Sequence, residues 1–240
     1  MFAIAALLIT TTFTQEEIVP VLWLDVQGNI LIDGDAVEPQ INPGVAKQKT
    51  PIGIAFNFSG EKSGILFGDK SSLKLTGNIT VSAWLFPKSY APNGAQSEVL
   101  FRGDDRAGYD PYFLALTKDG DIQFVIEDDK NEAEMVKTDI PLNQWTHITA
   151  SLNAATGEMA MWENGVKVST NSTTKRPIYD LIPKYVPGVG IGNVQNDKGP
   201  HNQPFNGLIA DLRLYSKVLT PSEVGYQRKR VTASSGVQPK

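Results

Sequence analysis

Apolar and polar residues alternate with a period of two along most of the chain. The segment 146–153, THITASLN, alternates over its whole length, which predicts a half-buried strand with Ile148, Ala150 and Leu152 toward the core. The segment 79–86, ITVSAWLF, begins with the same alternation and ends in an apolar run, which indicates that both faces are covered there. The chain therefore reads mainly as β-strands.

Short turn sequences separate these strands. Asn164-Gly165 lies between 159–163 and 166–168, and this dipeptide favours a type I′ hairpin turn because both central residues must adopt positive φ. We expect the same turn at Asp119-Gly120. Short strands at about ten-residue spacing, with turn residues between them, predict an all-β sandwich or barrel.

Helix is predicted at only one place, near the C-terminus. Thr220, Pro221 and Glu223 form a capping box, with Thr at the N-cap, Pro at the first helical position and Glu three residues after the cap. We expect a short helix there. Residues 228–240 are predicted to be a polar C-terminal tail.

The N-terminus begins with the apolar run MFAIAALLI, which has the length of a signal-peptide core and is too short to span a bilayer. We interpret residues 1–16 as a degenerate signal peptide, although neither a preceding basic residue nor a clear cleavage site is present. The alternative is a buried first strand. The globular domain is predicted to cover 17–227. If residues 1–16 direct export, the protein is secreted, periplasmic or attached to the cell surface.

Composition excludes several functional classes. The net charge is −4 and the pI about 5.3, so the chain lacks the basic character of a nucleic-acid-binding protein. It has no cysteine, which rules out disulfides and thiolate metal sites, and only two histidines. The 240 residues are enough for one sizeable core.

Four ordered segments resemble a known family. Residues 72–85, 143–148 (NQWTHI), 161–166 (MWENGV) and 205–215 resemble successive strand and hairpin motifs of laminin-G-like, concanavalin A-like lectin/glucanase jelly-roll domains. The resemblance implies an all-β, two-sheet antiparallel jelly-roll sandwich with one concave face. Members bind glycans, in some cases through calcium, or bind proteins, and others accompany enzymes.

The loop 191–199 is the best candidate for a calcium site. It resembles the calcium loop of the pentraxins, a related jelly-roll family, except that Val194 stands where an acidic ligand is expected. Calcium prefers six to eight oxygen ligands. The oxygen-bearing side chains of the loop are Asn193, Gln195, Asn196 and Asp197.

A second loop, 103–112, is rich in aspartate and corresponds in the pentraxin comparison to the region that completes the same site. If both loops share one rim, Asp104, Asp105 and Asp110 converge on Asp197. The metal ligands predicted on this basis are Asp104, Asp105, Asn196 and Asp197. The alternative is that these Asx and Gly residues only form turns.

Aromatic side chains in the same loop can stack on sugar rings. Tyr109 and Tyr112 are expected to be the most exposed, whereas Trp84 and Trp145 lie in apolar strand motifs and are expected in the core. Trp162 is compatible with either position. The predicted ligand-binding residues are Asp104, Asp105, Tyr109, Asp110, Tyr112, Asn193 and Gln195.

Two patterns suggest catalysis and are better explained otherwise. Residues 127–132 match E-x-D-x-x-E, the acid set of related β-glucanases, but their composition favours a hydrophilic hairpin loop. His147 with Ser151 or Asp139 imitates a triad, but there is no nucleophile elbow. Asp211, in the last strand motif, is expected to form a salt bridge or face solvent.

The sequence thus predicts a non-catalytic extracellular module that binds carbohydrate or mediates adhesion, possessing no transmembrane span and with calcium as the candidate cofactor. A protein-interaction or matrix-interaction sandwich without sugar specificity is one alternative. A glycoside hydrolase or lyase of the same fold is the other.

Overall fold

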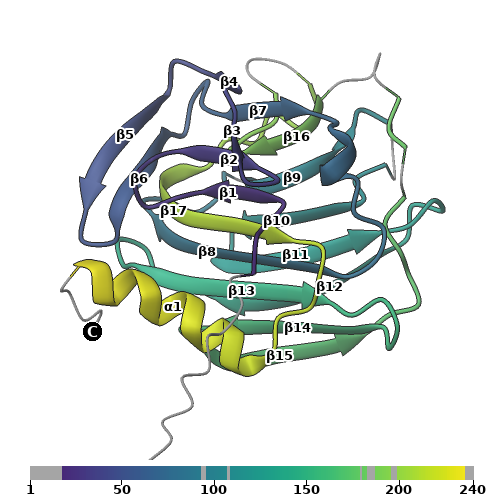
Figure 1. Cartoon of the computed structure of the whole chain (residues 1–240). Helices are drawn as coiled ribbons and strands as arrows, with labels where there is room; N and C mark the ends of the chain where they lie inside the picture. The colour runs from purple at the N-terminus through teal and green to yellow at the C-terminus, as the bar shows by residue number, and fades with distance from the viewer. Residues whose placement is uncertain are drawn as a thin grey trace, which may run out of the picture.

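The computed structural model describes residues 18–92, 96–106, 109–178, 180–182, 187–195 and 199–235. These residues form two antiparallel sheets packed face to face (Figure 1). The predicted signal peptide and the predicted ligands Asn196 and Asp197 lie outside the described residues. The predicted two-sheet sandwich is confirmed.

The ten-stranded sheet has the main order β15-β14-β13-β8-β17-β1-β2-β3, with β6 beside β17 and β5 beside β6. Its strands are β1 (Leu22–Leu24), β2 (Ile30–Ile32), β3 (Asp35–Ala36), β5 (Val45–Thr50), β6 (Gly53–Ser59), β8 (Ile79–Pro87), β13 (Thr146–Leu152), β14 (Glu158–Glu163), β15 (Val166–Ser172) and β17 (Asn206–Tyr215). The first and last segments of the domain meet here, because β1 pairs with β17.

The seven-stranded sheet has the order β12-β11-β10-β9-β16-β7-β4. Its strands are β4 (Gln40–Ile41), β7 (Ile65–Gly68), β9 (Gln96–Asp104), β10 (Tyr112–Thr117), β11 (Asp121–Glu127), β12 (Ala133–Asp139) and β16 (Pro187–Ile191). A single 3-10 turn, η1 (Ser71–Leu73), is described, and it follows β7. This sheet carries the loops that the sequence singled out.

The main core lies between the inner faces of the two sheets. Ile148, Ala150 and Leu152 of β13 share one buried cluster with Leu114 and Phe124 of the other sheet, so the predicted orientation of β13 is confirmed. The outer face of β13 is also buried, although its residues are mostly polar. A segment outside the two sheets must therefore cover the outer face of β13.

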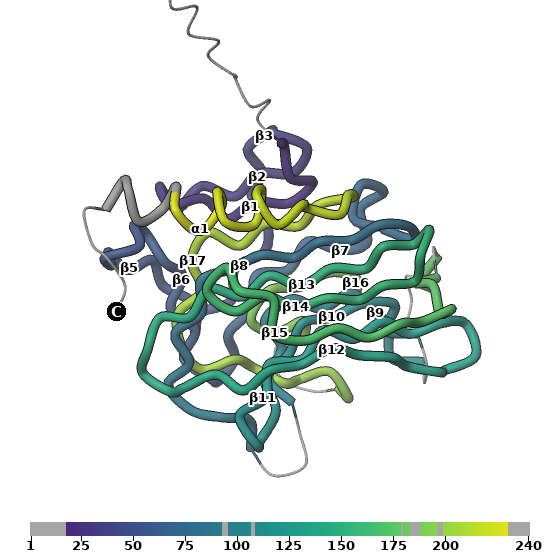
Figure 2. Tube along the Cα trace, turned by 90° about the horizontal axis from the view of Figure 1, so that it is seen from below, coloured from purple at the N-terminus to yellow at the C-terminus, as the bar shows by residue number. Residues whose placement is uncertain are grey.

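The cover is the helix α1 (Pro221–Ser235), which lies on the outer side of the ten-stranded sheet (Figure 2). Val224 of the helix packs with Trp162 and Tyr215 of the sheet. The predicted capping box is confirmed: the Thr220 N–H donates to Glu223 Oε2 at 2.6 Å, and the Glu223 N–H donates to Thr220 Oγ1 at 3.3 Å. No helix in the described ranges is long and apolar enough to cross a membrane.

The helix corrects the predicted C-terminal tail. It continues to Ser235, so the prediction of a tail beginning at residue 228 is wrong for 228–235. Gln227, which is buried, shows that the contact with the sheet extends beyond the first turn of the helix. Packing on one side stabilises a helix whose sequence is largely polar.

The two predicted hairpin turns differ. Asn164 and Gly165 have φ of 50° and 84°, as the type I′ prediction requires. At Asp119-Gly120 only the glycine has positive φ, 94°, so that type I′ prediction is wrong. Three residues separate β10 from β11, and in such a loop only the last residue needs the left-handed conformation.

Candidate functional site

Two loops that are far apart in the sequence meet on the seven-stranded sheet. The β9–β10 loop (105–111) and the β16–β17 loop (192–205) leave neighbouring strands, because β9 pairs with both β10 and β16. Gln195 Nε2 donates to Asp105 Oδ1 at 2.7 Å. The two loops are therefore in contact, which is the condition that the predicted site required, and we call their shared surface the loop rim.

The β16–β17 loop folds back over the outer face of its own sheet. The Glu98 N–H donates to the Gln203 carbonyl at 2.8 Å, which ties the loop to β9. Val194 packs with Phe101, Phe113 and Val125 in a small apolar cluster outside the main core. The loop is thus a cover for the sheet as well as part of the rim.

Asn193 organises this loop from a fully buried position. Its Oδ1 accepts hydrogen bonds from the N–H groups of Val194 at 2.9 Å and Gln203 at 3.0 Å, and its Nδ2 donates to Asn202 Oδ1 at 3.0 Å. A buried side chain with its polar atoms engaged supports loop backbone that has no sheet partner. Asn193, which we predicted to bind ligand, therefore acts on the rim by shaping it.

Asp104 is also committed to internal contacts. Its carboxylate accepts hydrogen bonds from Arg106 Nη2 at 2.6 Å and from the Ile182 N–H at 3.0 Å, and the residue is 1% exposed. Burial acts to raise the pKa of Asp104, but the hydrogen bonds from Arg106 and Ile182 outweigh it and hold the pKa below its ordinary value. The Arg106 guanidinium lies over the Tyr109 ring at 3.5 Å. Asp104 thereby anchors Arg106 and Tyr109 in the rim.

Asp110 and His201 bring the two loops together a second time. His201 Nε2 lies 3.5 Å from Asp110 Oδ1 and 3.2 Å from the Asp104 carbonyl oxygen, and the imidazole packs on Phe101 with a ring separation of 4.6 Å. Burial lowers the pKa of His201, so the imidazole is neutral at pH 7 and forms no full ion pair with Asp110. Gly103 is required here, because a Cβ atom would lie 2.3 Å from Asp110 Oδ1.

Three carboxyl groups beneath and beside the loops have unusual environments. Burial, reinforced by the charge of Glu127, raises the pKa of Asp110 to about 8. Burial also raises the pKa of Glu127, and it raises the pKa of Glu98 well above the ordinary value. Among the described residues, neither carboxylate oxygen of Glu98 has a hydrogen-bond partner. We call Glu98, Asp110 and Glu127 the acid cluster.

Sequence reasoning identified Asp110 as a ligand-binding candidate but did not assign Glu98 or Glu127 to the rim. Glu98 stands in the buried strand β9 together with the charged residues Arg102 and Asp104, and charges within an otherwise apolar strand are the sequence signal that marks them. With a pKa of about 8, Asp110 keeps its proton at pH 7, so its carboxyl group can both donate and accept hydrogen bonds. Asp110 is therefore chemically suited to contact hydroxyl groups, whereas Glu98 is fully buried.

The predicted exposure of Tyr112 is wrong. Tyr112 is the first residue of β10 and is 0% exposed, and its hydroxyl donates to the Leu73 carbonyl at 2.6 Å. Period-two alternation places it on the same inward face as Leu114, so it cannot stack on a ligand. Tyr109, which precedes the strand, is half-buried at the rim. Trp84 is fully buried, as predicted, and Trp162 is buried beneath α1.

The described residues do not form a ready metal centre. No three Asp, Glu or His side chains among them are grouped closely enough to hold an ion. Asp104 can become a ligand only by giving up Arg106, and Gln195 Oε1 already accepts the His201 N–H at 2.9 Å, while the Asp105 carboxylate is exposed. The described donor set alone therefore does not fit calcium, and calcium binding by the full loop stays a prediction.

The catalytic alternatives find little support in the local geometry. The E-x-D-x-x-E segment is the hairpin between β11 and β12, as predicted, with Asp128 Oδ1 accepting the Lys130 N–H at 2.9 Å. Glu132 pairs with Lys175 at 2.9 Å. His147 is buried on the other sheet and its Nε2 lies 3.1 Å from Ser82 Oγ, so it approaches neither Ser151 nor Asp139 as a triad would need.

Comparison with known proteins identifies the class. The family model of the concanavalin A-like lectin/glucanases superfamily matches residues 59–225, and the chain belongs to this superfamily. No curated protein gives a significant match to the sequence.

Solved structures share the fold at low sequence identity. The binding domain of Paraclostridial Mosquitocidal Protein 1 has a TM-score of 0.68 and 17% identity, over 88% of this chain and 52% of that one. The receptor-binding domain of botulinum neurotoxin type G has a TM-score of 0.65 and 14% identity, over 88% and 51%. The binding domain of botulinum neurotoxin DC in complex with SialylT has a TM-score of 0.65 and 12% identity, over 88% and 51%. This chain spans about half the length of these structures, and the likeness concerns the fold.

Proposed function

We propose that this protein is a non-catalytic, extracellular or cell-surface module that binds a glycan at the loop rim. The observation that carries the proposal is the junction of two distant loops through Gln195 and Asp105. Sandwich domains commonly place binding residues on loops supported by a rigid sheet. Similar folds include domains described as binding domains, one of them in complex with SialylT.

Within the rim, each group has a role that its contacts favour. Tyr109 offers an aromatic surface held in place by Arg106, and Asp105 and Gln195 offer exposed or half-exposed polar atoms. Asp110, with its raised pKa, adds a carboxyl group that can donate as well as accept hydrogen bonds. An aromatic platform flanked by polar hydrogen-bonding groups suits a sugar ring with its hydroxyls.

The test is binding of the purified full chain to a broad glycan array, once with calcium and once with EDTA. We expect binding that falls about fivefold or more in Tyr109→Ala, because truncating a central aromatic contact commonly removes 1 kcal/mol or more. The matched control is Tyr226→Ala, since Tyr226 is 47% exposed on α1, on the outer side of the other sheet. Equal loss in both variants would place the binding surface elsewhere.

The calcium arm tests the proposed cofactor separately. Binding that EDTA abolishes supports a calcium-dependent rim that uses Asp105 together with loop residues 196 and 197. Binding that survives EDTA retains the glycan proposal and rejects calcium. Failure to bind any glycan at high protein concentration favours the alternative, a protein-interaction module of the same fold.

A further inference from the structure

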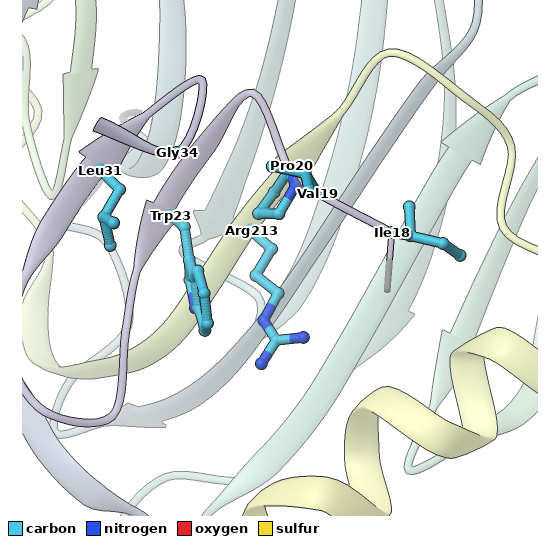
Figure 3. A pocket seen from close by; sticks show the side chains of 7 residues that line it. All are labelled: Ile18, Val19, Pro20, Trp23, Leu31, Gly34 and Arg213. Atoms are coloured by element: carbon cyan, nitrogen blue, oxygen red, sulfur yellow. The ribbon is translucent and has the colours of Figure 1, made fainter. Parts of the chain in front are cut away.

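A second concave site lies on the outer side of the ten-stranded sheet, away from the loop rim. It is a cavity of about 210 Å³ between the entry of the chain at residues 18–20, the β1–β2 pair and β17 (Figure 3). Trp23, Leu31 and Arg213 line its floor. This volume is below the usual range for drug-sized ligands, so it suits a small molecule of about ten non-hydrogen atoms.

The floor is formed by strand register. Trp23 of β1 stands directly opposite Arg213 of β17 on one side and opposite Leu31 of β2 on the other. Residues directly opposite in antiparallel strands project from the same face, so these three side chains form a row across the sheet. Figure 3 shows the Trp23 ring and the Arg213 guanidinium side by side.

Asp211 holds this row in a fixed arrangement. Its Oδ1 accepts hydrogen bonds from Trp23 Nε1 at 2.8 Å, Arg213 Nε at 3.0 Å and Arg213 Nη2 at 2.9 Å. The expected salt bridge of Asp211 is thereby confirmed, at 2.9 Å. Asp211 has a φ of 47° and lies in an irregularity of the β17–β8 register, and such non-glycine conformations tend to occur at functional sites.

Arg213 retains unused hydrogen-bonding capacity. A guanidinium has five N–H donors, and Asp211 engages only the edge formed by Nε and Nη2. Within the described part of the chain no hydrogen bond engages Nη1, and Arg213 lines the cavity although the residue is only 3% exposed. The remaining edge, Nη1 with Nη2, has the fork geometry that pairs with a carboxylate.

Apart from Arg213, the described residues that line the cavity are apolar. Ile18, Val19 and Pro20 form one wall, and Val19 is 64% exposed at its edge. A ligand that matches the whole cavity therefore needs one anionic end for Arg213 and one apolar body for Trp23 and Leu31. We propose that this cavity binds a small carboxylate with an aromatic or short alkyl body, independently of glycan binding at the loop rim.

The experiment titrates the full chain with phenylacetate and follows the Trp23 indole N–H by two-dimensional ¹H–¹⁵N NMR. The signal is assigned by its loss in Trp23→Phe. We expect saturable shifts with a Kd of about 0.1–1 mM, as befits so small a ligand. Phenylacetamide, which has the same shape without the charge, is expected to bind at least about fivefold more weakly.

The matched variants are Val19→Glu and Val19→Lys, both at an exposed position that tolerates substitution. Val19→Glu places a negative charge beside the anionic end and is expected to weaken phenylacetate binding about threefold or more, whereas Val19→Lys maintains or strengthens it. Absence of saturable shifts, equal binding of the amide, or equal behaviour of the two variants overturns the proposal. Glycan-array binding is expected to be the same in both variants, so the two proposals can fail separately.

Discussion

The two outer faces of the sandwich are both covered, but by different structures with different chemistry. On the ten-stranded sheet the cover is α1, which buries Trp162, and the polar side chains beneath it include Ser82 and His147. On the seven-stranded sheet the cover is the β16–β17 loop, which encloses Phe101 and the carboxyl group of Glu98. One face combines a helix with Ser82, His147 and the Asp211–Arg213 ion pair, and the other combines a loop with several acids.

The difference follows from how the helix and the loop satisfy the hydrogen-bonding groups of their own backbones. A helix pairs its own N–H and C=O groups, so it can present apolar residues such as Val224 to the sheet. A loop must find side-chain partners for its backbone, which Asn193 supplies here. The loop therefore brings polar groups into a buried place, on the face where we propose glycan binding.

Trp162→Ala is the substitution with the largest expected effect. The side chain is buried between α1 and the sheet, so truncation should lower the free energy of unfolding by about 3–5 kcal/mol, measured by urea denaturation. Tyr226→Ala, on the exposed side of the same helix, should change it by no more than about 0.5 kcal/mol. Equal losses would mean that α1 does not cover this face.

Asp110→Asn tests the acid cluster on the seven-stranded sheet through the pH dependence of stability. The folded pKa of about 8 exceeds the ordinary 3.8, so the unfolded chain releases this proton at lower pH than the folded chain does. The stabilisation from protonated Asp110 is present below about pH 4 and is lost as pH rises through 8. The variant should remove up to about 1.4 kcal/mol per pH unit of that decline, measured by urea denaturation between pH 5 and 8. Asp35→Asn, at an exposed position on β3 of the other sheet, serves as control, and an unchanged slope in Asp110→Asn would contradict the raised pKa.

His147→Gln tests the helix-covered face. Its effect on the pH dependence of stability should have the opposite sign and span a narrower pH range. Burial, with smaller contributions from the charges of Arg213 and Arg228, lowers the pKa of His147 from 6.5 to about 3. The unfolded chain therefore takes up this proton first, and stability is lost as pH falls from 6.5 toward 3. The variant should flatten this loss by up to about 1.4 kcal/mol per pH unit between pH 4 and 6.5. A slope equal to that of the unmodified protein would show that His147 is not a source of acid sensitivity.

Thr220→Ala has the smallest expected effect. It removes the N-cap hydrogen bond to the Glu223 N–H and should cost about 1 kcal/mol in thermal or urea unfolding. Ser222→Ala, an exposed position in the first turn, should be nearly neutral. A neutral result for Thr220→Ala would mean that tertiary packing alone sets the start of α1.

Local patterns were enough to predict the strands at 79–86, 146–153 and 159–163, the Asn164-Gly165 turn and the capping box of α1. Each of these depends on residues within a few positions of one another, such as the positive φ at Asn164 and Gly165. The length of α1 was not predictable in this way, because its last turns are stabilised on a sheet that the local sequence does not reveal.

The sequence alone was thus sufficient for the all-β class and the family, whereas the contact between the two loops was only a supposition taken from the pentraxin resemblance. Only the tertiary structure decided that Tyr112 points inward, that Glu98 joins Asp110 and Glu127, and that Trp23 lies beside Arg213. Period-two alternation tells which residues share a face of one strand, but not which strand lies next to it or what covers the face. Strand order and register supply that information, and they place residues 190 positions apart in the chain, Trp23 and Arg213, in direct contact.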